Sequence, residues 1–161
     1  MKHLYLLLFL SFSLSRILYA QDTPGIGDIP FDSKLDNPKF QLCNTRAWQG
    51  YEWKTADDET MRWISNHLKE RYIAKKEWSG QNGYITVRFV VNCLGLTDRF
   101  RGMGVSEDLK ASSFNKELIS YLIKLAKEEA WPIGTYNQKS LDYYHKVIFK
   151  IVNGQLKEVV I

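Results

Sequence analysis

The chain has 161 residues, of which 45% are hydrophobic and 25% are charged, and its formal net charge is +4. This length fits a single domain with an adequate hydrophobic core. The charges are nearly balanced, which argues against a nucleic-acid partner, because such a partner requires a clustered basic face. We expect the Lys75-Lys76 pair and the Arg99/Arg101 pair to be solvated.

The N-terminus predicts a secretory signal peptide over residues 1–20. A basic start is followed by the apolar run Leu4–Leu14, and the segment ends in a small residue. The run is too short to span a bilayer, which takes about 20 residues. The alternative is an uncleaved membrane anchor, since Arg16 and Leu18 are unusual so close to a cleavage site. Cleavage would remove Lys2 and Arg16, lower the net charge from +4 to +2, and leave the protein in the periplasm or secreted.

Cys43 and Cys93 are the only two cysteines, and both follow the predicted signal peptide. In an oxidising compartment such a pair predicts one disulfide. The alternative is two separate buried thiols. Neither cysteine has a histidine or another cysteine at metal-ligand spacing, so we expect no metal site and no cofactor.

The predicted organisation has two parts after residue 20. Residues 21–56 are expected to form an N-terminal leader and a packed extension, because prolines and glycines punctuate the start of this segment. Trp48, Tyr51 and Trp53 in the extension follow no clear pattern. Residues 57–161 are expected to form the main domain.

A first helix is predicted from about Glu59 to Tyr72. Asp57 and Asp58 can cap it, because the free N–H groups and the helix dipole favour carboxylates at this end. Its buried residues recur at helical spacing: Met61, Ile64, Leu68 and Tyr72.

A strand is predicted between Gly83 and an Asn-Cys-Leu-Gly turn that ends at Gly95. Four apolar residues alternate with more polar ones and indicate one buried face: Ile85, Val87, Phe89 and Val91. Val90 interrupts the polar face, so we expect that face to be partly covered as well. The segment Leu96–Arg101 can return as an antiparallel partner, and Gly102 and Gly104 are expected to end or bend it.

A second helix is predicted from a cap at Ser112 or Ser113 to about Ala130. Pro132 follows and cannot continue a helix. The buried stripe of this helix again has helical spacing: Phe114, Leu118, Tyr121, Leu122 and Leu125.

The C-terminal segment predicts a β-hairpin. Tyr143–Val152 is rich in aromatic and β-branched residues, and Asn153-Gly154 accepts the positive φ angles of a tight type I′ turn. The chain would then return over residues 155–161. In that register Lys150 and Lys157 would lie nearly opposite each other, which is mildly unfavourable.

No catalytic site stands out, and we predict that the protein is not an enzyme. His67 lies on the polar face of a predicted helix and His145 lies within a predicted strand, with no serine or cysteine motif beside either. Glu128 and Glu129 end the second helix and are expected to be solvated. The remaining candidate is the edge of a sheet, whose free main-chain groups can accept an extended peptide or can be blunted by lysines and self-association.

The ordered set of motifs resembles the C-terminal domain of TonB-type energy transducers, and is closest to the divergent versions of the Bacteroidetes group. The set comprises the first helix, Gly83–Gly95, the second helix, Trp131 with Pro132 and Gly134, and residues 149–151 before the Asn-Gly turn. The resemblance covers residues 57–161. The membrane helix and the proline-rich linker of the family are missing, so we expect the terminal domain alone, exported and unanchored.

The resemblance implies an α+β fold in which two helices pack on one face of a small antiparallel sheet. It also implies that the domain binds an extended segment of an envelope protein or of an outer-membrane transporter by strand addition, without catalytic residues. We place this binding in the C-terminal hairpin, with these candidate residues: Tyr143, His145, Val147, Phe149, Ile151, Leu156 and Val159.

Two other functions remain open at this point. A small secreted carbohydrate-binding protein or hydrolase could use exposed rings of Trp48, Trp53 and Trp78. A structural envelope protein could instead form a homodimer through the sheet edge.

Overall fold

The structure is a computed structural model that describes residues 25–49 and 56–161. The chain divides into two compact units, residues 1–31 and residues 32–161. In the described part of the first unit, Ile26 and Ile29 exchange backbone hydrogen bonds of 2.9 and 3.0 Å across a turn. The predicted signal peptide and the side chains of Tyr51 and Trp53 lie outside the described residues.

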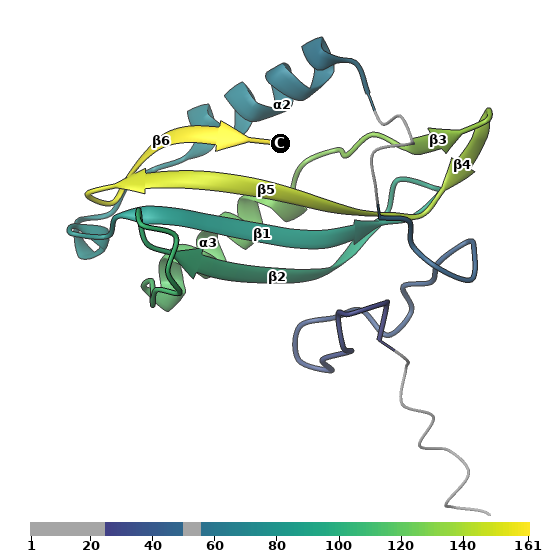
Figure 1. Cartoon of the computed structure of the whole chain (residues 1–161), viewed down its shortest axis with the longest axis horizontal. Helices are drawn as coiled ribbons and strands as arrows, with labels where there is room; N and C mark the ends of the chain where they lie inside the picture. The colour runs from purple at the N-terminus through teal and green to yellow at the C-terminus, as the bar shows by residue number, and fades with distance from the viewer. Residues whose placement is uncertain (1–24, 50–55) are drawn as a thin grey trace, which may run out of the picture. The chain divides into compact units, whose positions relative to one another are not determined.

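A four-stranded antiparallel sheet forms the centre of the second unit (Figure 1). In spatial order its strands are β2 (Thr97–Val105), β1 (Gly83–Val91), β5 (Tyr143–Val152) and β6 (Gln155–Val160). The turn between β5 and β6 consists of Asn153 and Gly154, whose φ angles are 49° and 72°. The predicted hairpin is therefore confirmed.

Two helices, α2 (Asp58–Arg71) and α3 (Lys116–Lys127), cover one face of this sheet, and a short 3₁₀ helix, η2 (Lys76–Trp78), leads into β1. This arrangement confirms the predicted α+β fold. Alternate residues of β1 and β5 face the helices because side chains change face at each residue of a strand. The core between the layers includes Ile64, Leu68, Ile85, Val87, Phe89, Leu118, Leu122, Val147, Phe149 and Ile151.

The predicted helix caps are correct for α2 and wrong for α3. At α2, the carboxylate of Asp57 accepts a hydrogen bond from the Thr60 N–H at 2.7 Å. At α3, the cap is Asn115 rather than Ser112 or Ser113. The chain at Ser112 is still paired with β2, because its N–H donates to a β2 carbonyl, so the helix begins only beyond it.

Gly102 and Gly104 were predicted to end or bend the second strand, and neither ends it, because β2 continues through both to Val105. A side-chain carbon at Gly102 would collide with Ile119, and one at Gly104 would collide with the ring of Phe114. Glycine at these two positions therefore allows the α3 layer to approach the strand closely.

A bulge in β6 changes the cross-strand pair at Lys150. The register shifts between Lys150 and Ile151, so that Glu158 rather than Lys157 lies opposite Lys150. The predicted lysine pair is therefore wrong. Residues of opposite charge take its place, which favours this register.

A second, two-stranded sheet was not predicted. It consists of β3 (Gly134–Tyr136) and β4 (Lys139–Leu141). The turn residues Asn137 and Gln138 have φ angles of 49° and 62°. Glutamine gives no turn signal, and three-residue strands are too short to show a periodic pattern.

Within the second unit, the part of the extension before α2 is attached to the rest of the domain by a disulfide and by backbone pairing. Cys43 and Cys93 are bonded to each other, with their Cα atoms 5.9 Å apart, which confirms the predicted disulfide. The Trp48 N–H donates to the Asp142 carbonyl at 2.8 Å, and the Trp48 carbonyl accepts from the Tyr144 N–H at 3.1 Å. A packed extension is what the sequence predicts here.

Candidate functional site

The side chains predicted to bind a partner lie mostly in the core. Six of the seven are buried: Tyr143, Val147, Phe149, Ile151, Leu156 and Val159. Five of the seven lie on β5, which is paired with β1 over Tyr143–Ile151 but with β6 only over Ile148–Val152. These side chains stabilise the fold, and binding through the hairpin stays a prediction for the main chain of β6.

His145 is the seventh predicted residue and the one histidine among them. Its ring lies against the rings of Phe89, Trp131 and Tyr143, at centroid distances of 5.4, 4.8 and 5.7 Å. Its Nε2 has no hydrogen-bond partner among the described residues. Burial lowers the pKa of His145 from 6.5 to about 4, so the ring is neutral at pH 7.

One edge of the sheet is β6, and α2 lies beside it (Figure 1). The Ser65 hydroxyl donates a hydrogen bond of 2.7 Å to the Val159 carbonyl. This carbonyl therefore already has a hydrogen-bond donor. A guest strand that used it would have to break the bond to Ser65.

The other edge is β2, and described residues cover both of its ends. Val105 pairs with Ala111, and the Gly104 carbonyl accepts from the Ser112 N–H at 3.2 Å. Near the opposite end, a backbone N–H of the extension donates to the carboxylate of Asp98 at 3.1 Å. Neither edge is a fully open template for strand addition.

A cluster of ion pairs attaches the extension to β2. Arg101 donates to both carboxylate oxygens of Asp36, at 2.8 and 2.7 Å, and Arg99 pairs with Asp98. The Arg99 side chain is 1% exposed, so the prediction that it is solvated is wrong. Burial raises the pKa of Asp98. Burial also acts to raise the pKa of Asp36, but the hydrogen bonds from Arg101 and Asp32 outweigh it and the pKa is lowered.

Glu129 was also predicted to be solvated, and this is wrong. Its side chain is 3% exposed, accepts from Arg71 at 2.6 Å and lies 3.0 Å from Nδ1 of His67. The His67 ring stacks on Trp63, which is 60% exposed and which the sequence analysis did not single out. The cluster joins α2 to the segment that follows α3.

Of the three tryptophans proposed to form an exposed surface, the structure describes Trp48 and Trp78. Trp78 is fully buried, so the prediction that it is exposed is wrong. Its ring fills the space between the two helices, at 5.9 Å from Tyr72 and 5.3 Å from Tyr121. Trp48 is partly buried and stacks on Tyr136 at 5.8 Å.

Cys43, Cys93 and Asp142 place a sulfur or oxygen atom each within 4.8 Å of one another. The two sulfurs are bonded together. One Asp142 oxygen accepts from the N–H groups of Cys43 and Cys93, at 3.1 and 2.9 Å, and the other accepts from the Asn44 N–H at 2.7 Å. The carboxylate therefore supports the disulfide loop and is not an open metal ligand.

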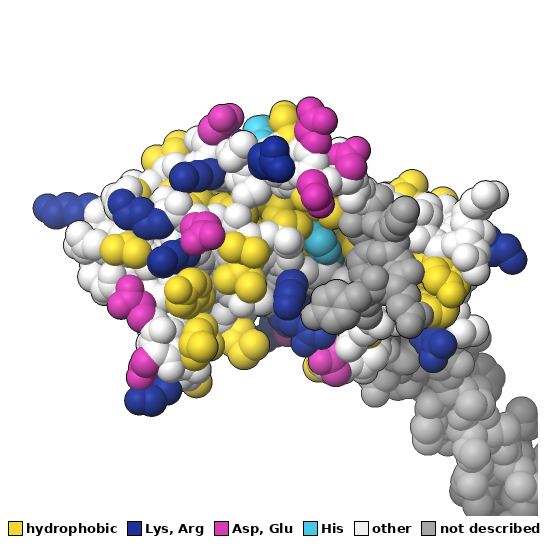
Figure 2. All heavy atoms as spheres, turned by 45° about the horizontal axis from the view of Figure 1, so that its top comes forward, with side chains coloured by type: hydrophobic (Ala, Val, Ile, Leu, Met, Phe, Trp, Pro, Cys, Tyr) yellow, Lys and Arg dark blue, Asp and Glu magenta, His cyan; other side chains and the backbone are white. Residues whose placement is uncertain are grey.

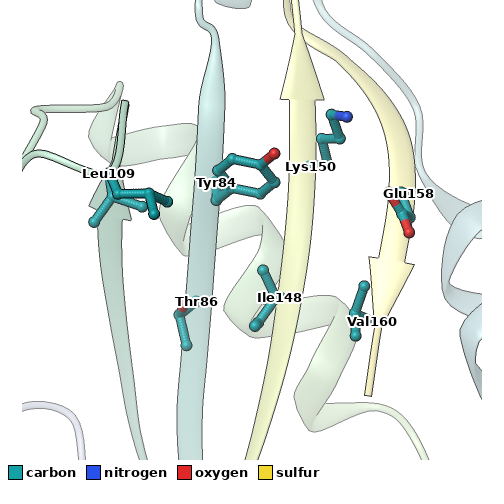
Figure 3. Close-up of a pocket in the computed structure, with 8 residues that line it drawn as sticks. Tyr84, Thr86, Leu109, Ile148, Lys150, Glu158 and Val160 are labelled. Carbon is teal, nitrogen blue, oxygen red and sulfur yellow. The ribbon is translucent and has the colours of Figure 1, made fainter. Parts of the chain in front are cut away.

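The face of the sheet opposite the helices carries an apolar groove of about 360 Å³. Its lining residues are Tyr84, Thr86, Val105, Leu109, Ile148, Lys150, Glu158 and Val160. In Figure 3, Tyr84 and Ile148 lie between Leu109 on one side and Val160 on the other. Figure 2 shows hydrophobic side chains gathered on this part of the surface, with lysine and arginine side chains at their border.

The pairing register aligns the residues of this face in rows across the strands. One row contains Met103, Thr86, Ile148 and Val160. The next contains Val105, Tyr84, Lys150 and Glu158. Along β5 the same face carries Lys146, Ile148 and Lys150, because they pair with Arg88, Thr86 and Tyr84 of β1. Basic and apolar side chains thus alternate along this face of β5, of which Ile148 and Lys150 line the groove.

Sequence reasoning missed this groove, although part of its signal was present. Ile148 and Val160 are apolar residues on the otherwise polar face of the hairpin, as Val90 is on the polar face of β1. They could have indicated a second apolar surface. Leu109 lies in a turn and has no periodic signal.

The chain was compared with known proteins at three levels, and no family model, no curated protein and no solved structure matches it. The fold and the candidate site together describe an α+β domain. Its groove lies on the face of the sheet that the helices leave open. No helix in residues 25–49 and 56–161 is long and apolar enough to cross a membrane. The disulfide fits a compartment outside the reducing cytosol.

Proposed function

We propose that this chain is a binding module of the cell envelope, similar to the C-terminal domain of TonB-type transducers, that holds an extended segment of another envelope protein. It works in the periplasm or after secretion. The observation that carries the proposal is the apolar groove on the open sheet face. Contiguous apolar surface rimmed by polar residues is typical of a protein-interaction site.

The groove is the better preformed site for such a segment. The resemblance implies strand addition at an edge, but Ser65 occupies the Val159 carbonyl at β6. Both ends of β2 are covered as well. On the open face, by contrast, Met103 is 61% and Val160 is 47% exposed. Burying these side chains would stabilise a complex without prior opening of the fold.

Photo-cross-linking in the native cell envelope tests the proposal. It also distinguishes binding on the open sheet face from binding at the edge strand β6. A benzophenone amino acid would replace Met103 on the open face, Lys157 on β6 or Lys69 on α2, all three of which are exposed. We expect Met103 to cross-link to an extended segment of an envelope protein. Cross-links from Lys157 alone would indicate strand addition at β6. If neither site exceeds the Lys69 control, the proposal is rejected.

A further inference from the structure

Leu109 occupies a backbone conformation that suits glycine. Its φ angle is 61°, in the left-handed region where an L side chain crowds the following carbonyl. The turn is closed by hydrogen bonds from the Leu109 N–H to the Ser106 carbonyl and from the Ser106 N–H to the Lys110 carbonyl, of 3.0 and 2.9 Å. A hairpin loop of this kind ends in a left-handed residue that is typically glycine.

The side chain of Leu109 gains nothing from burial in the core, because it is 73% exposed. It lines the open-face groove instead (Figure 3). The turn that carries it is held by the pairing of Val105 with Ala111, and an exposed ion pair of 2.8 Å joins Lys110 to Asp108 within it. A strained backbone conformation that the surrounding structure maintains is typical of a functional position.

The face of β5 that carries the groove indicates the chemistry of a ligand: Ile148 and Lys150 line the groove, and Lys146 follows on the same face outside the lining. Lys146, Ile148 and Lys150 follow one another at two-residue intervals on β5, which is the side-chain period of an extended chain. An extended segment above this strand can place an apolar side chain over Ile148 and acidic side chains near the two lysines. Glu158 is the one acidic residue among those that line the groove, and it faces Lys150 across the strand pair.

We propose that Leu109 clamps an extended peptide segment on the open sheet face, and that this segment carries an apolar residue with an acidic residue two positions away on each side. This inference rests on the proposed function, since it specifies the ligand of the same groove. The left-handed conformation holds the Leu109 side chain over the groove before the ligand arrives. A preformed wall lowers the ordering cost of binding.

The test selects peptides from a random ten-residue display library on the full-length, disulfide-bonded protein. The variants are Leu109→Asn, Lys150→Glu and Glu158→Gln, and the matched control is Leu94→Asn, since Leu94 is an exposed leucine in another turn (69% exposed). Asparagine tolerates the left-handed region, so Leu109→Asn keeps the fold. Affinity is measured by fluorescence anisotropy and stability by thermal unfolding.

We expect the selected peptides to share the acidic–apolar–acidic pattern. Leu109→Asn should weaken their binding at least tenfold while the unfolding midpoint rises, and Leu94→Asn should leave binding unchanged. Lys150→Glu should weaken binding, and Glu158→Gln should strengthen it. Unchanged binding in Leu109→Asn, or a lower unfolding midpoint, overturns the role of Leu109.

The outcome also separates this inference from the proposed function. Peptides of a different pattern that still compete with cross-linking from Met103 overturn the ligand chemistry and leave a binding module in place. No selected peptide, together with no cross-link from Met103, rejects both.

Discussion

The Ser65 hydroxyl and the Val159 carbonyl are joined by a hydrogen bond of 2.7 Å, which connects α2 to the edge strand β6. This bond satisfies a main-chain acceptor that would otherwise be available to a guest strand. It is one reason why we propose the sheet face, rather than this edge, as the binding site.

Replacing Ser65 with alanine should lower the free energy of unfolding by about 1 kcal/mol, because Val159 loses its hydrogen-bond donor. The same change at Ser120, an exposed serine of α3, is the control and should cost less. Urea denaturation measures both. If Ser65→Ala costs no more than Ser120→Ala, the bond does not stabilise the edge.

Asp142 is fully buried, and its carboxylate accepts from both cysteine N–H groups and from Asn44. Asp142→Asn turns one acceptor into a donor that faces other donors, so we expect a loss of about 2–3 kcal/mol of stability. Asn44→Ala removes a single side-chain hydrogen bond of 2.9 Å and should cost about 1 kcal/mol. Equal losses in the two variants would contradict this account.

The disulfide closes a sequence separation of 50 residues. Replacing Cys43 and Cys93 with serine should lower the free energy of unfolding by about 4 kcal/mol on the chain-entropy estimate. Denaturation with and without a reducing agent gives the same comparison in the unmodified protein. Intact mass after alkylation without reductant should show two protected cysteines, and alkylation of either one would contradict the bond.

His145 should make stability depend on pH. Burial lowers its pKa from 6.5 to about 4 in the fold, so between these values the unfolded chain binds more protons than the folded one. Stability should therefore fall as the pH drops from 6.5 towards 4, by up to roughly 3 kcal/mol from this group.

The matched variant for this prediction is His145→Gln, which cannot titrate. Chemical denaturation of both proteins between pH 4 and 7 gives the difference that belongs to His145, because the carboxylates titrate in both. Parallel pH profiles for the two proteins would rule out the shifted pKa.

Local sequence patterns predicted most of the helices and strands correctly. The alternation over β1, the helical stripe through Ile64 and Leu68, and the Asn153-Gly154 turn each predicted the correct element. Two of the errors share one cause, which is contact between segments distant in the sequence. Asn115 rather than Ser112 caps α3 because the chain is still paired with β2, and β2 passes through its glycines because α3 packs there.

The candidate site divides in the same way. The candidate hairpin was predicted from its sequence, but the face that its side chains occupy was not. An alternation with a period of two residues shows only that alternate residues share a face of the sheet. It does not show which face the helices will cover. Ile148 and Val160 became a groove wall and floor only because α2 and α3 both pack on the other side.

The sequence by itself determined the α+β class, the hairpin and the Cys43–Cys93 bond, because these depend on periodicity, on the φ angles of a turn and on a single possible cysteine pair. Only the tertiary structure decided that Arg99, Glu129 and Trp78 are buried and that Leu109 overhangs an open groove. Burial and strain of this kind arise from contacts between segments that are distant in the sequence. A local sequence pattern does not contain information about such contacts.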